Sequence, residues 1–159
     1  HEFPNEADLL RGEAKSDMLE PFVEEVRRYY PFFPFVVARV KKDFEWNGYT
    51  FPKDTLTLLD LYGTNHDPDI WSEPNRFNPE RFMNWDKNLF AFIPQGGGQV
   101  DKGHRCPGEQ MTVEILKTTL DFFVNDIRYT LPEQDLSYSM NDIPSLPVSN
   151  LLIHQVTFV

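Results

Sequence analysis

The chain contains a single cysteine, Cys106, among its 159 residues. One cysteine excludes an internal disulfide and a four-cysteine zinc site, and it favours a reducing, cytoplasmic setting. Basic residues are also few, because 15 lysines and arginines accompany 25 aspartates and glutamates and leave a net charge of -10. So acidic a chain lacks the basic face that binds nucleic acid, and it is poorly suited to an anionic membrane surface.

Long apolar runs and a starting methionine are absent as well. No apolar run approaches the roughly 20 residues needed to span a bilayer, so we expect no membrane span. The first residues, His1-Glu2-Phe3, follow no signal-peptide pattern, and we expect the chain to be a piece of a longer one. Its 40% hydrophobic and 14% aromatic residues nevertheless suffice for a packed core, within one domain or a large part of one.

Hydrophobic periodicity predicts two helices. The first runs from Asp17 to Tyr30 and ends at two prolines, which lack the amide donor that a helix needs. The second starts at Pro107, because proline is favoured at the first helical position, and continues to about Asn125. The expected apolar face of this second helix comprises Met111, Ile115, Leu116, Leu120 and Phe123.

Short strands and loops are expected elsewhere. The β-branched run 35–40 predicts a strand, Asn47-Gly48 predicts a hairpin turn within 44–51, and residues 55–59 are expected to form a buried strand. Residues 1–17 are typical of a helix end or loop, and the tail 128–159 of strands with proline-rich turns. Residues 63–82 predict an ordered loop that buries four side chains, namely Ile70, Trp71, Phe77 and Phe82. This mixture indicates an α+β fold.

Cys106 is the residue best placed for chemistry. Just before a predicted helix, its sulfur would face unpaired amides and the positive end of the helix dipole, which favour a thiolate. The neighbours His104 and Arg105 add hydrogen-bond donors, and the glycines of Gln95-Gly96-Gly97-Gly98 let the backbone approach a flat ligand. These features suit a metal-binding thiolate.

Two other roles for Cys106 stay open from the residues alone. Cysteine is often a small buried hydrophobe. It can also act as a nucleophile, for which His66, His104 or His154 would be the base.

Glu25 and Arg28 share a helix face and can pair, and Glu24 and Arg27 have the same spacing. Such pairs are worth little when exposed. The aromatic and proline residues that follow favour burial, and a buried pair needs a further partner. Arg81 is the candidate for that partner.

Three phenylalanines follow the first predicted helix, on a turn that prolines make stiff. Phe32, Phe33 and Phe35 are suited to walling an apolar pocket. Ordinary core packing explains them equally well at this stage.

Three motifs occur in order along the chain. Glu25-x-x-Arg28 comes first, the segment from His66-Asp67-Pro68 to Pro79-Glu80-Arg81-Phe82 follows, and Cys106-Pro107-Gly108 comes last. In this order and spacing they resemble the cytochrome P450 superfamily over residues 18–159. The resemblance implies the C-terminal, haem-binding part of that fold, which is α+β, mainly α, with small β-hairpins and a cysteine loop leading into a helix. The long central helix of the family is expected to lie outside residues 1–159.

The cysteine loop departs from the general pattern of the superfamily, Phe-x-x-Gly-x-Arg-x-Cys-x-Gly. Gln99 stands at the place of the Phe, the nearest upstream Phe is Phe92, and the loop is seven residues longer. Four segments resemble instead the bacterial fatty-acid peroxygenase branch, namely 29–32, 58–68, 92–98 and 104–109. Gln99-Val100 departs from the Asp-His that often follows the glycines in that branch.

The resemblance implies roles for the site residues. Cys106 would be the axial thiolate of haem b, and Glu25, Arg28 and Arg81 would form a structural triad behind the haem. His104 and, less directly, Arg105 would face a haem propionate. The other residues expected at the site are Gln95 and Gly96 beside the haem and Phe32, Phe33 and Phe35 around an acyl chain.

Members of the branch use hydrogen peroxide directly to hydroxylate a long-chain fatty acid near its carboxylate, and some decarboxylate it. An arginine on the long central helix holds that carboxylate, so we expect no catalytic residue in this chain. The chain alone is expected to be a poor catalyst and to self-associate through an uncovered apolar face. The alternatives are a reductase-dependent monooxygenase of the same superfamily, a non-catalytic fragment or binding module, and a cysteine hydrolase.

Overall fold

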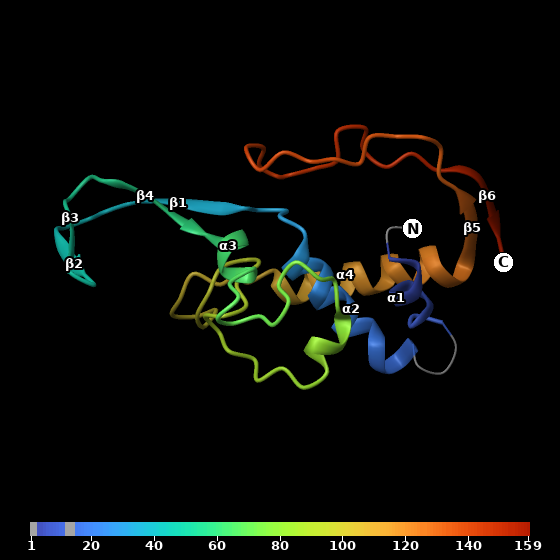
Figure 1. Cartoon of the computed structure of the whole chain (residues 1–159), viewed down its shortest axis with the longest axis horizontal. Helices are drawn as coiled ribbons and strands as arrows, with labels where there is room; N and C mark the ends of the chain where they lie inside the picture. The colour runs from blue at the N-terminus through green and yellow to red at the C-terminus, as the bar shows by residue number, and fades with distance from the viewer. Residues whose placement is uncertain (1–2, 12–14) are drawn as a thin grey trace.

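The computed structural model describes residues 3–11 and 15–159 as a helical body with two extended arms (Figure 1). The longer helices are α2 (Lys15–Tyr29) and α4 (Glu109–Asp121), and the shorter ones are α1 (Pro4–Asp8) and α3 (Leu61–Asn65). The predicted α+β, mainly α, fold is confirmed. For residues 1–17 a helix end or loop was expected, and the structure has α1 and the start of α2; residues 1, 2 and 12–14 lie outside the described ones.

Helix α2 agrees with the helix predicted from Asp17 to Tyr30. It ends at Tyr29, because Pro31 has no amide hydrogen to continue the ladder. Its apolar face packs into a buried cluster that contains Met18, Phe22 and Phe77. The opposite end of the helix carries the arginines that build the site.

Helix α4 begins later than predicted. Pro107 is not its first residue, because Gly108 is the N-cap and the regular helix starts at Glu109. The amide of Glu109 donates to the carbonyl of Cys106 at 3.2 Å, three residues back, so a tighter turn precedes the helix. At its other end α4 continues as a π-helical turn over Phe122–Asp126, in agreement with the predicted end near Asn125.

The apolar face predicted for α4 is partly wrong. Met111 and Ile115 are exposed, whereas Glu109 and Val113 are the buried side chains of this helix. The contact between α4 and α2 includes an ion pair between Arg27 and Glu109. That polar contact turns the Glu109 side of α4 toward α2, which a search for apolar periodicity does not reveal.

The predicted strands form antiparallel pairs. β1 (Phe35–Arg39) pairs with β4 (Leu56–Asp60), and β2 (Phe44–Trp46) pairs with β3 (Tyr49–Phe51). Asn47 and Gly48 both have positive φ, 49° and 78°, as a tight hairpin turn requires, so the predicted hairpin is confirmed. β4 is exposed, and the prediction that it is buried is wrong: the β1–β4 ribbon extends away from the helices (Figure 1).

The loop after β4 wraps around α2. Trp71 and Phe77 are buried as predicted and Phe82 is half-buried, but Ile70 is exposed at the turn. Residues Pro79–Phe82 form a 3₁₀ turn, with the Asn78 side chain accepting from the amide of Glu80. This capped turn directs Arg81 toward α2.

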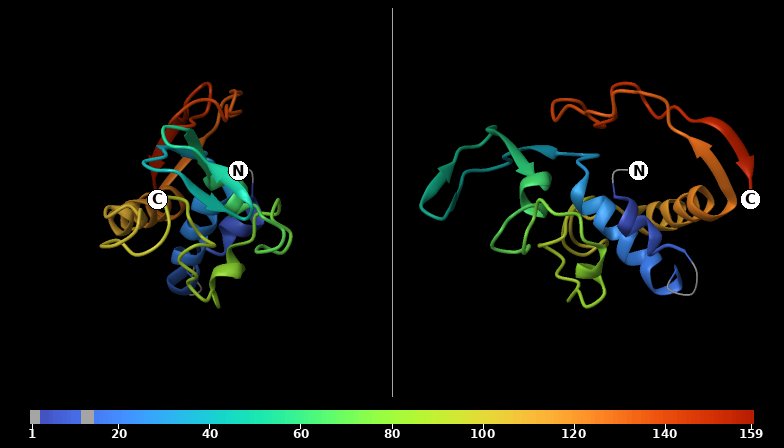
Figure 2. Two further views of the ribbon diagram at one scale, coloured as in Figure 1. Left: turned by 90° about the vertical axis from the view of Figure 1, so that its left-hand side faces the viewer. Right: turned by 45° about the vertical axis from the view of Figure 1, so that its right-hand side comes forward.

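The tail forms the second arm. β5 (Ile127–Thr130) pairs with β6 (His154–Phe158), and the residues between them are mostly irregular rather than stranded as predicted. Figure 2 shows this arm running back over the helices. The amide of Ser145 donates to the carbonyl of Phe32 at 2.9 Å, so the arm is joined to the end of α2.

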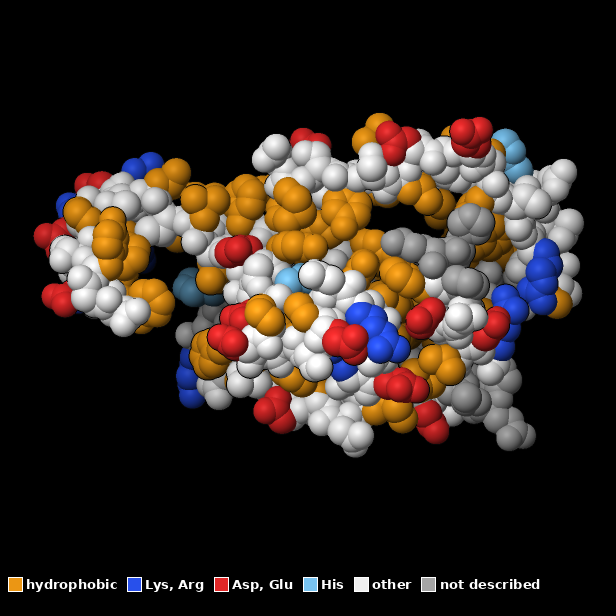
Figure 3. All heavy atoms as spheres, viewed as in Figure 1, with side chains coloured by type: hydrophobic (Ala, Val, Ile, Leu, Met, Phe, Trp, Pro, Cys, Tyr) orange, Lys and Arg blue, Asp and Glu red, His pale blue; other side chains and the backbone are white. Residues whose placement is uncertain are grey.

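Hydrophobic side chains are exposed on both arms. Figure 3 shows them on the β1–β4 ribbon and along the strip between the C-terminal arm and the helices. Leu58 of β4 and Leu151 of the tail are among them. Within the part of the chain that the structure describes, no helix has the length and apolar character needed to cross a membrane.

Two tryptophans provide a matched test of this core. Trp71 is 2% exposed, stacks on Trp85 with ring centroids 4.4 Å apart, and donates from Nε1 to the Thr64 carbonyl at 3.2 Å. Trp71→Ala should lower the free energy of unfolding by about 3–5 kcal/mol. Trp46 is 70% exposed, so Trp46→Ala should change it by less than about 0.5 kcal/mol. Urea denaturation followed by circular dichroism measures both, and equal losses would contradict the assignment.

Candidate functional site

The carboxylate of Glu25 is completely buried and lies at the centre of a polar cluster. Arg28 binds it with two hydrogen bonds, from Nε at 2.7 Å and from Nη2 at 2.8 Å. Arg81 Nε lies 3.1 Å from the same carboxylate, and the amide of Asn78 donates to it at 2.7 Å. The structure therefore brings together the three residues of the expected triad, Glu25, Arg28 and Arg81.

The two arginines of this cluster also bind the loop around α2. Arg28 Nη1 donates to the carbonyls of Asn65 and Pro74, each at 2.9 Å. Arg81 Nη1 donates to the carbonyl of Ser72 at 2.9 Å. Since both guanidinium groups have several donors in fixed directions, the cluster determines the path of the loop.

A second buried cluster surrounds Arg27, and only its pairing with Glu24 was suggested by the sequence. Arg27 forms ion pairs with Glu24 and with Glu109, and its Nη2 donates to Gln95 Oε1 at 3.0 Å. Arg105 binds both oxygens of the Glu109 carboxylate, and its Nη2 donates at 3.0 Å to Oε1, the oxygen that Arg27 also binds. Burial raises the pKa of the Glu24 carboxyl above its usual value, and the charge of Arg27 opposes this effect. The spacings of Glu24–Arg27 and Arg105–Glu109 are visible in the sequence, whereas the contacts of Arg27 with Gln95 and Glu109 are not.

The cysteine loop folds back on itself before α4. The amide of Cys106 donates to the carbonyl of Gln95 at 2.9 Å, and the amide of His104 donates to the carbonyl of Gly97 at 3.1 Å. Gly96 has a φ of 91°, and a Cβ there would collide with the carbonyl oxygen of His104. A glycine is therefore required for the two sides of the loop to approach each other.

The Cys106 thiol suits a metal whose other ligands are not protein side chains. Within residues 3–11 and 15–159, no cluster of three or more His, Cys, Asp or Glu side chains could hold a metal ion. Cys106 is a half-buried free thiol, and a Cβ at Gly108 would lie 3.7 Å from its sulfur. A single cysteine sulfur just before a helix would suit the sulfur ligand of haem, which would bring its iron and the other donors with it.

The other residues expected at a haem lie on the same loop. Gln95 and Gly96 form the side that faces Cys106, as described above. His104 is exposed, and the Arg105 guanidinium is directed at Glu109. Cys106 and Arg105 both border a hollow of about 250 Å³, together with Arg27.

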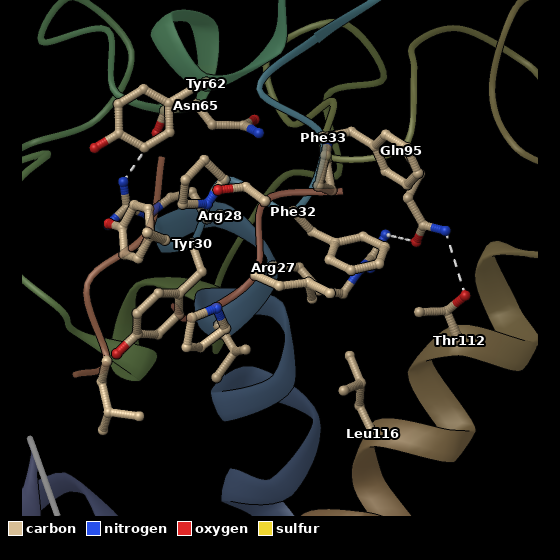
Figure 4. A pocket seen from close by; sticks show the side chains of 18 of the residues that line it. Arg27, Arg28, Tyr30, Phe32, Phe33, Tyr62, Asn65, Gln95, Thr112 and Leu116 are labelled. Atoms are coloured by element: carbon tan, nitrogen blue, oxygen red, sulfur yellow. Dashed lines mark hydrogen bonds between the residues drawn. The ribbon is translucent and has the colours of Figure 1, made fainter. Parts of the chain in front are cut away.

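A larger cavity of about 570 Å³ lies between α2, α4 and the C-terminal arm. Figure 4 shows Phe32, Phe33 and Leu116 among its walls, with Gln95 linked to both Arg27 and Thr112. The lining is mainly apolar and aromatic, which suits a hydrophobic ligand. Phe35 does not line this cavity, because it is already the first residue of β1.

The histidines do not support the alternative of a cysteine nucleophile. The His66 ring stacks on Tyr62 at 4.0 Å, and its Nδ1 lies 3.0 Å from the Tyr62 carbonyl. His154 is exposed on β6. Across the described ranges, no hydrogen bond joins an imidazole to the Cys106 thiol, which a nucleophile and its base require.

A buried carboxylate–arginine cluster thus lies behind a loop that ends in a single cysteine, in the order that the three motifs predicted. The family model of cytochrome P450 matches residues 14–153. The chain belongs to the cytochrome P450 family, as its motifs predicted.

Known proteins similar to this chain are longer than it is. Cytochrome P450 1A1 of Sparus aurata is 41% identical in an alignment of 124 residues that covers 76% of this chain and 24% of that protein. The solved structure of cytochrome P450EX alpha (CYP152N1) with myristic acid is 55% identical, with a TM-score of 0.90 over 100% of this chain and 38% of that one.

A variant of cytochrome P450 OleT, solved in complex with arachidonic acid, is also similar. It is 43% identical, with a TM-score of 0.88 over 99% of this chain and 37% of that one. Two of these structures hold a fatty acid, in agreement with the fatty-acid branch that the sequence resembles.

Gly96 and Gly48 allow the cysteine loop to be tested with a matched control. Both have positive φ, so alanine at either position carries a backbone cost of about 1–2 kcal/mol. Nothing lies within 4 Å of a Cβ at Gly48, whereas one at Gly96 collides with His104. Gly96→Ala should therefore lower the free energy of unfolding by at least about 2 kcal/mol more than Gly48→Ala. Urea denaturation measures the difference, and similar losses would show that the loop tolerates a side chain.

His66 should make stability depend on pH. Burial lowers its pKa below the usual value of 6.5, although a hydrogen bond to the Tyr62 carbonyl opposes this. The unfolded chain then binds a proton at a higher pH than the folded one, so the free energy of unfolding decreases as pH falls below about 6.5. His66→Gln should reduce this decrease, and His154→Gln should not. Denaturation midpoints measured from about pH 8 to pH 5 check this. The same dependence of the midpoint on pH in both variants would contradict it.

Proposed function

We propose that the protein to which this chain belongs is a haem-thiolate oxidoreductase that uses hydrogen peroxide to hydroxylate long-chain fatty acids near the carboxylate, or to decarboxylate them. The observation that carries this proposal is the 55% identity, over the whole chain, to a structure that holds myristic acid. The longer cysteine loop after Phe92 favours the same branch. Because the chain spans 38% of that structure, the proposal concerns a longer polypeptide.

Haem b, when bound, would supply the iron and the oxidation chemistry. The role of this chain is to hold the cysteine ligand in place and to shape the pocket. The amide of Cys106 is tied to the Gln95 carbonyl at 2.9 Å, which restricts the direction of the sulfur. The Glu25–Arg28–Arg81 cluster holds the loop behind α2 rigid, and we assign His104 and Arg105 to the propionate side.

The cavity of about 570 Å³ is the proposed place for an acyl chain. Phe32 and Phe33 wall it, and its mainly apolar lining excludes water from the chain of a fatty acid. Phe35 was expected in the same role, but it lies outside the lining of the cavity. The acid–base group is expected outside this chain, so none of the described residues is assigned as catalytic.

A reductase-dependent monooxygenase is the second candidate. Two relatives, cytochrome P450 1A1 at 41% identity and cytochrome P450 84A4 at 31% identity, carry other names within the family than the two proteins whose structures hold a fatty acid. Gln99-Val100 also departs from the pattern of the peroxygenase branch. Turnover of a fatty acid with hydrogen peroxide alone would favour the first candidate, and turnover only with NADPH and redox partners would favour the second.

The decisive measurement is the absorption spectrum of the reduced, haem-loaded longer protein with carbon monoxide. A thiolate-type Soret band is expected, and Cys106→Ala should remove it, because the sulfur that supplies the axial bond is gone. A colourless protein that takes up no haem would favour a non-catalytic fragment or binding module. A band that persists in Cys106→Ala would contradict the assignment of the ligand.

The isolated chain is proposed to be a poor catalyst and to self-associate. It would lack the carboxylate-binding arginine, and the exposed leucines of β4 offer an apolar surface. Peroxide-dependent turnover by residues 1–159 alone, or a clean monomer in size-exclusion chromatography, would contradict the corresponding part of this proposal.

A further inference from the structure

Arg27 lies next to the Glu25 cluster on α2 but contacts a different part of the chain. Its side chain is almost completely buried. Nη1 pairs with Glu24, one helical turn before it, while Nη2 binds both Gln95 and Glu109. The latter two residues are 68 and 82 positions away in sequence.

The two residues that Arg27 Nη2 binds are the same two that hold the peptide groups of Cys106. The amide of Cys106 donates to the Gln95 carbonyl at 2.9 Å, and the carbonyl of Cys106 accepts from the Glu109 amide at 3.2 Å. The side chain of each holding residue is then bonded to Arg27. One nitrogen of Arg27 thus ties together the residues on both sides of the cysteine.

A third contact reaches the start of the cysteine loop. The Arg27 guanidinium carbon lies 5.3 Å from the centre of the Phe92 ring, within the range of a cation–π interaction. Phe92, Gln95 and Glu109 therefore all touch a single side chain of α2. The loop and the first residue of α4 share one fixed point on that helix.

We propose that Arg27 is a positioning residue that holds the Cys106 thiolate in the direction required for the axial bond to haem iron. This inference rests on the proposed haem-thiolate function. Arg27 acts through Gln95 and Glu109 and is not assigned any contact with haem or substrate. Its role is separate from that of Arg28, whose hydrogen bonds go to Glu25 and to carbonyls of the loop between Asn65 and Arg76.

Arginine is required at this position because of its shape. Its fork supplies separate nitrogens, so that Glu24 occupies Nη1 and the loop residues occupy Nη2. Lysine keeps the positive charge but has one nitrogen, which cannot serve all three partners with the same geometry. Arg27→Lys therefore removes the tie while the charge remains.

The test uses the longer, haem-loaded protein and compares Arg27→Lys with Arg11→Lys. Arg11 is exposed and pairs only with Asp8 among the described residues, so its variant controls for the arginine-to-lysine change. The quantity measured is the fraction of the reduced carbon monoxide complex that has the thiolate-type Soret band, counted among haem-loaded molecules. Because only loaded molecules are counted, loss of the sulfur bond is measured separately from loss of haem.

Arg27→Lys should lower the thiolate-type fraction, and it should weaken haem binding by about tenfold, as expected for residues that support a metal ligand. Glu109→Leu, which removes the acceptor oxygens and keeps the backbone bond to Cys106, should shift the spectrum in the same direction. The thiolate-type fraction of the double variant should fall by less than the sum of the two single decreases, since both variants remove the same contact between Arg27 and Glu109. Arg11→Lys should match the unchanged protein.

An unchanged thiolate-type fraction in Arg27→Lys would overturn the inference. If Arg27→Lys does not fold, Glu109→Leu alone decides, and an unchanged fraction in that variant has the same meaning. If the unchanged protein has no thiolate-type band, the proposed function itself fails. A normal band there together with unaffected variants contradicts only the role of Arg27.

Discussion

The buried carboxylate of Glu25 constrains the rest of the structure. A carboxylate without partners in the interior costs several kcal/mol, and this one is 0% exposed. Its partners come from α2 itself, from Arg81 and from the amide of Asn78. Helix α2 can therefore pack in this position only if the loop of residues 61–82 closes around it. The aromatic core around Trp71 and Phe77 forms on the same loop.

Helix α2 positions two segments because its two arginines are adjacent. Neighbouring residues of an α-helix project about 100° apart, so Arg27 and Arg28 point in different directions. Arg28 binds the loop that carries Arg81, and Arg27 binds the loop that carries Cys106. A single helix thus relates the structural triad to the cysteine loop, and the two loops are also joined directly, because the amide of Ile93 donates to Asn65 Oδ1 at 3.0 Å.

Local features were predictable from the sequence, and long-range ones were not. The extent of α2, the Asn47-Gly48 turn and the pairing of Glu25 with Arg28 depend on residues close in sequence. The contact of Arg27 with Glu109 joins residues 82 apart, and no spacing reveals it. The prediction of burial was wrong for the same reason at Ile70, Met111 and the leucines of β4. Burial depends on what packs against an element and not on the hydrophobic pattern of that element.

The length of the cysteine loop explains why so many contacts are needed to hold it. A longer loop has more conformations to lose when its ends are brought together, and this loop is seven residues longer than the general pattern of the superfamily. Backbone hydrogen bonds join Gly98 to Leu89 at 2.9 Å and Cys106 to Gln95 at 2.9 Å, and Gly96 permits the close approach to His104. These bonds define the shape of the loop but not its place on the helices. Its place depends on contacts with other elements: Arg27 binds it from α2, and the Asn65 side chain accepts from the amide of Ile93 at 3.0 Å.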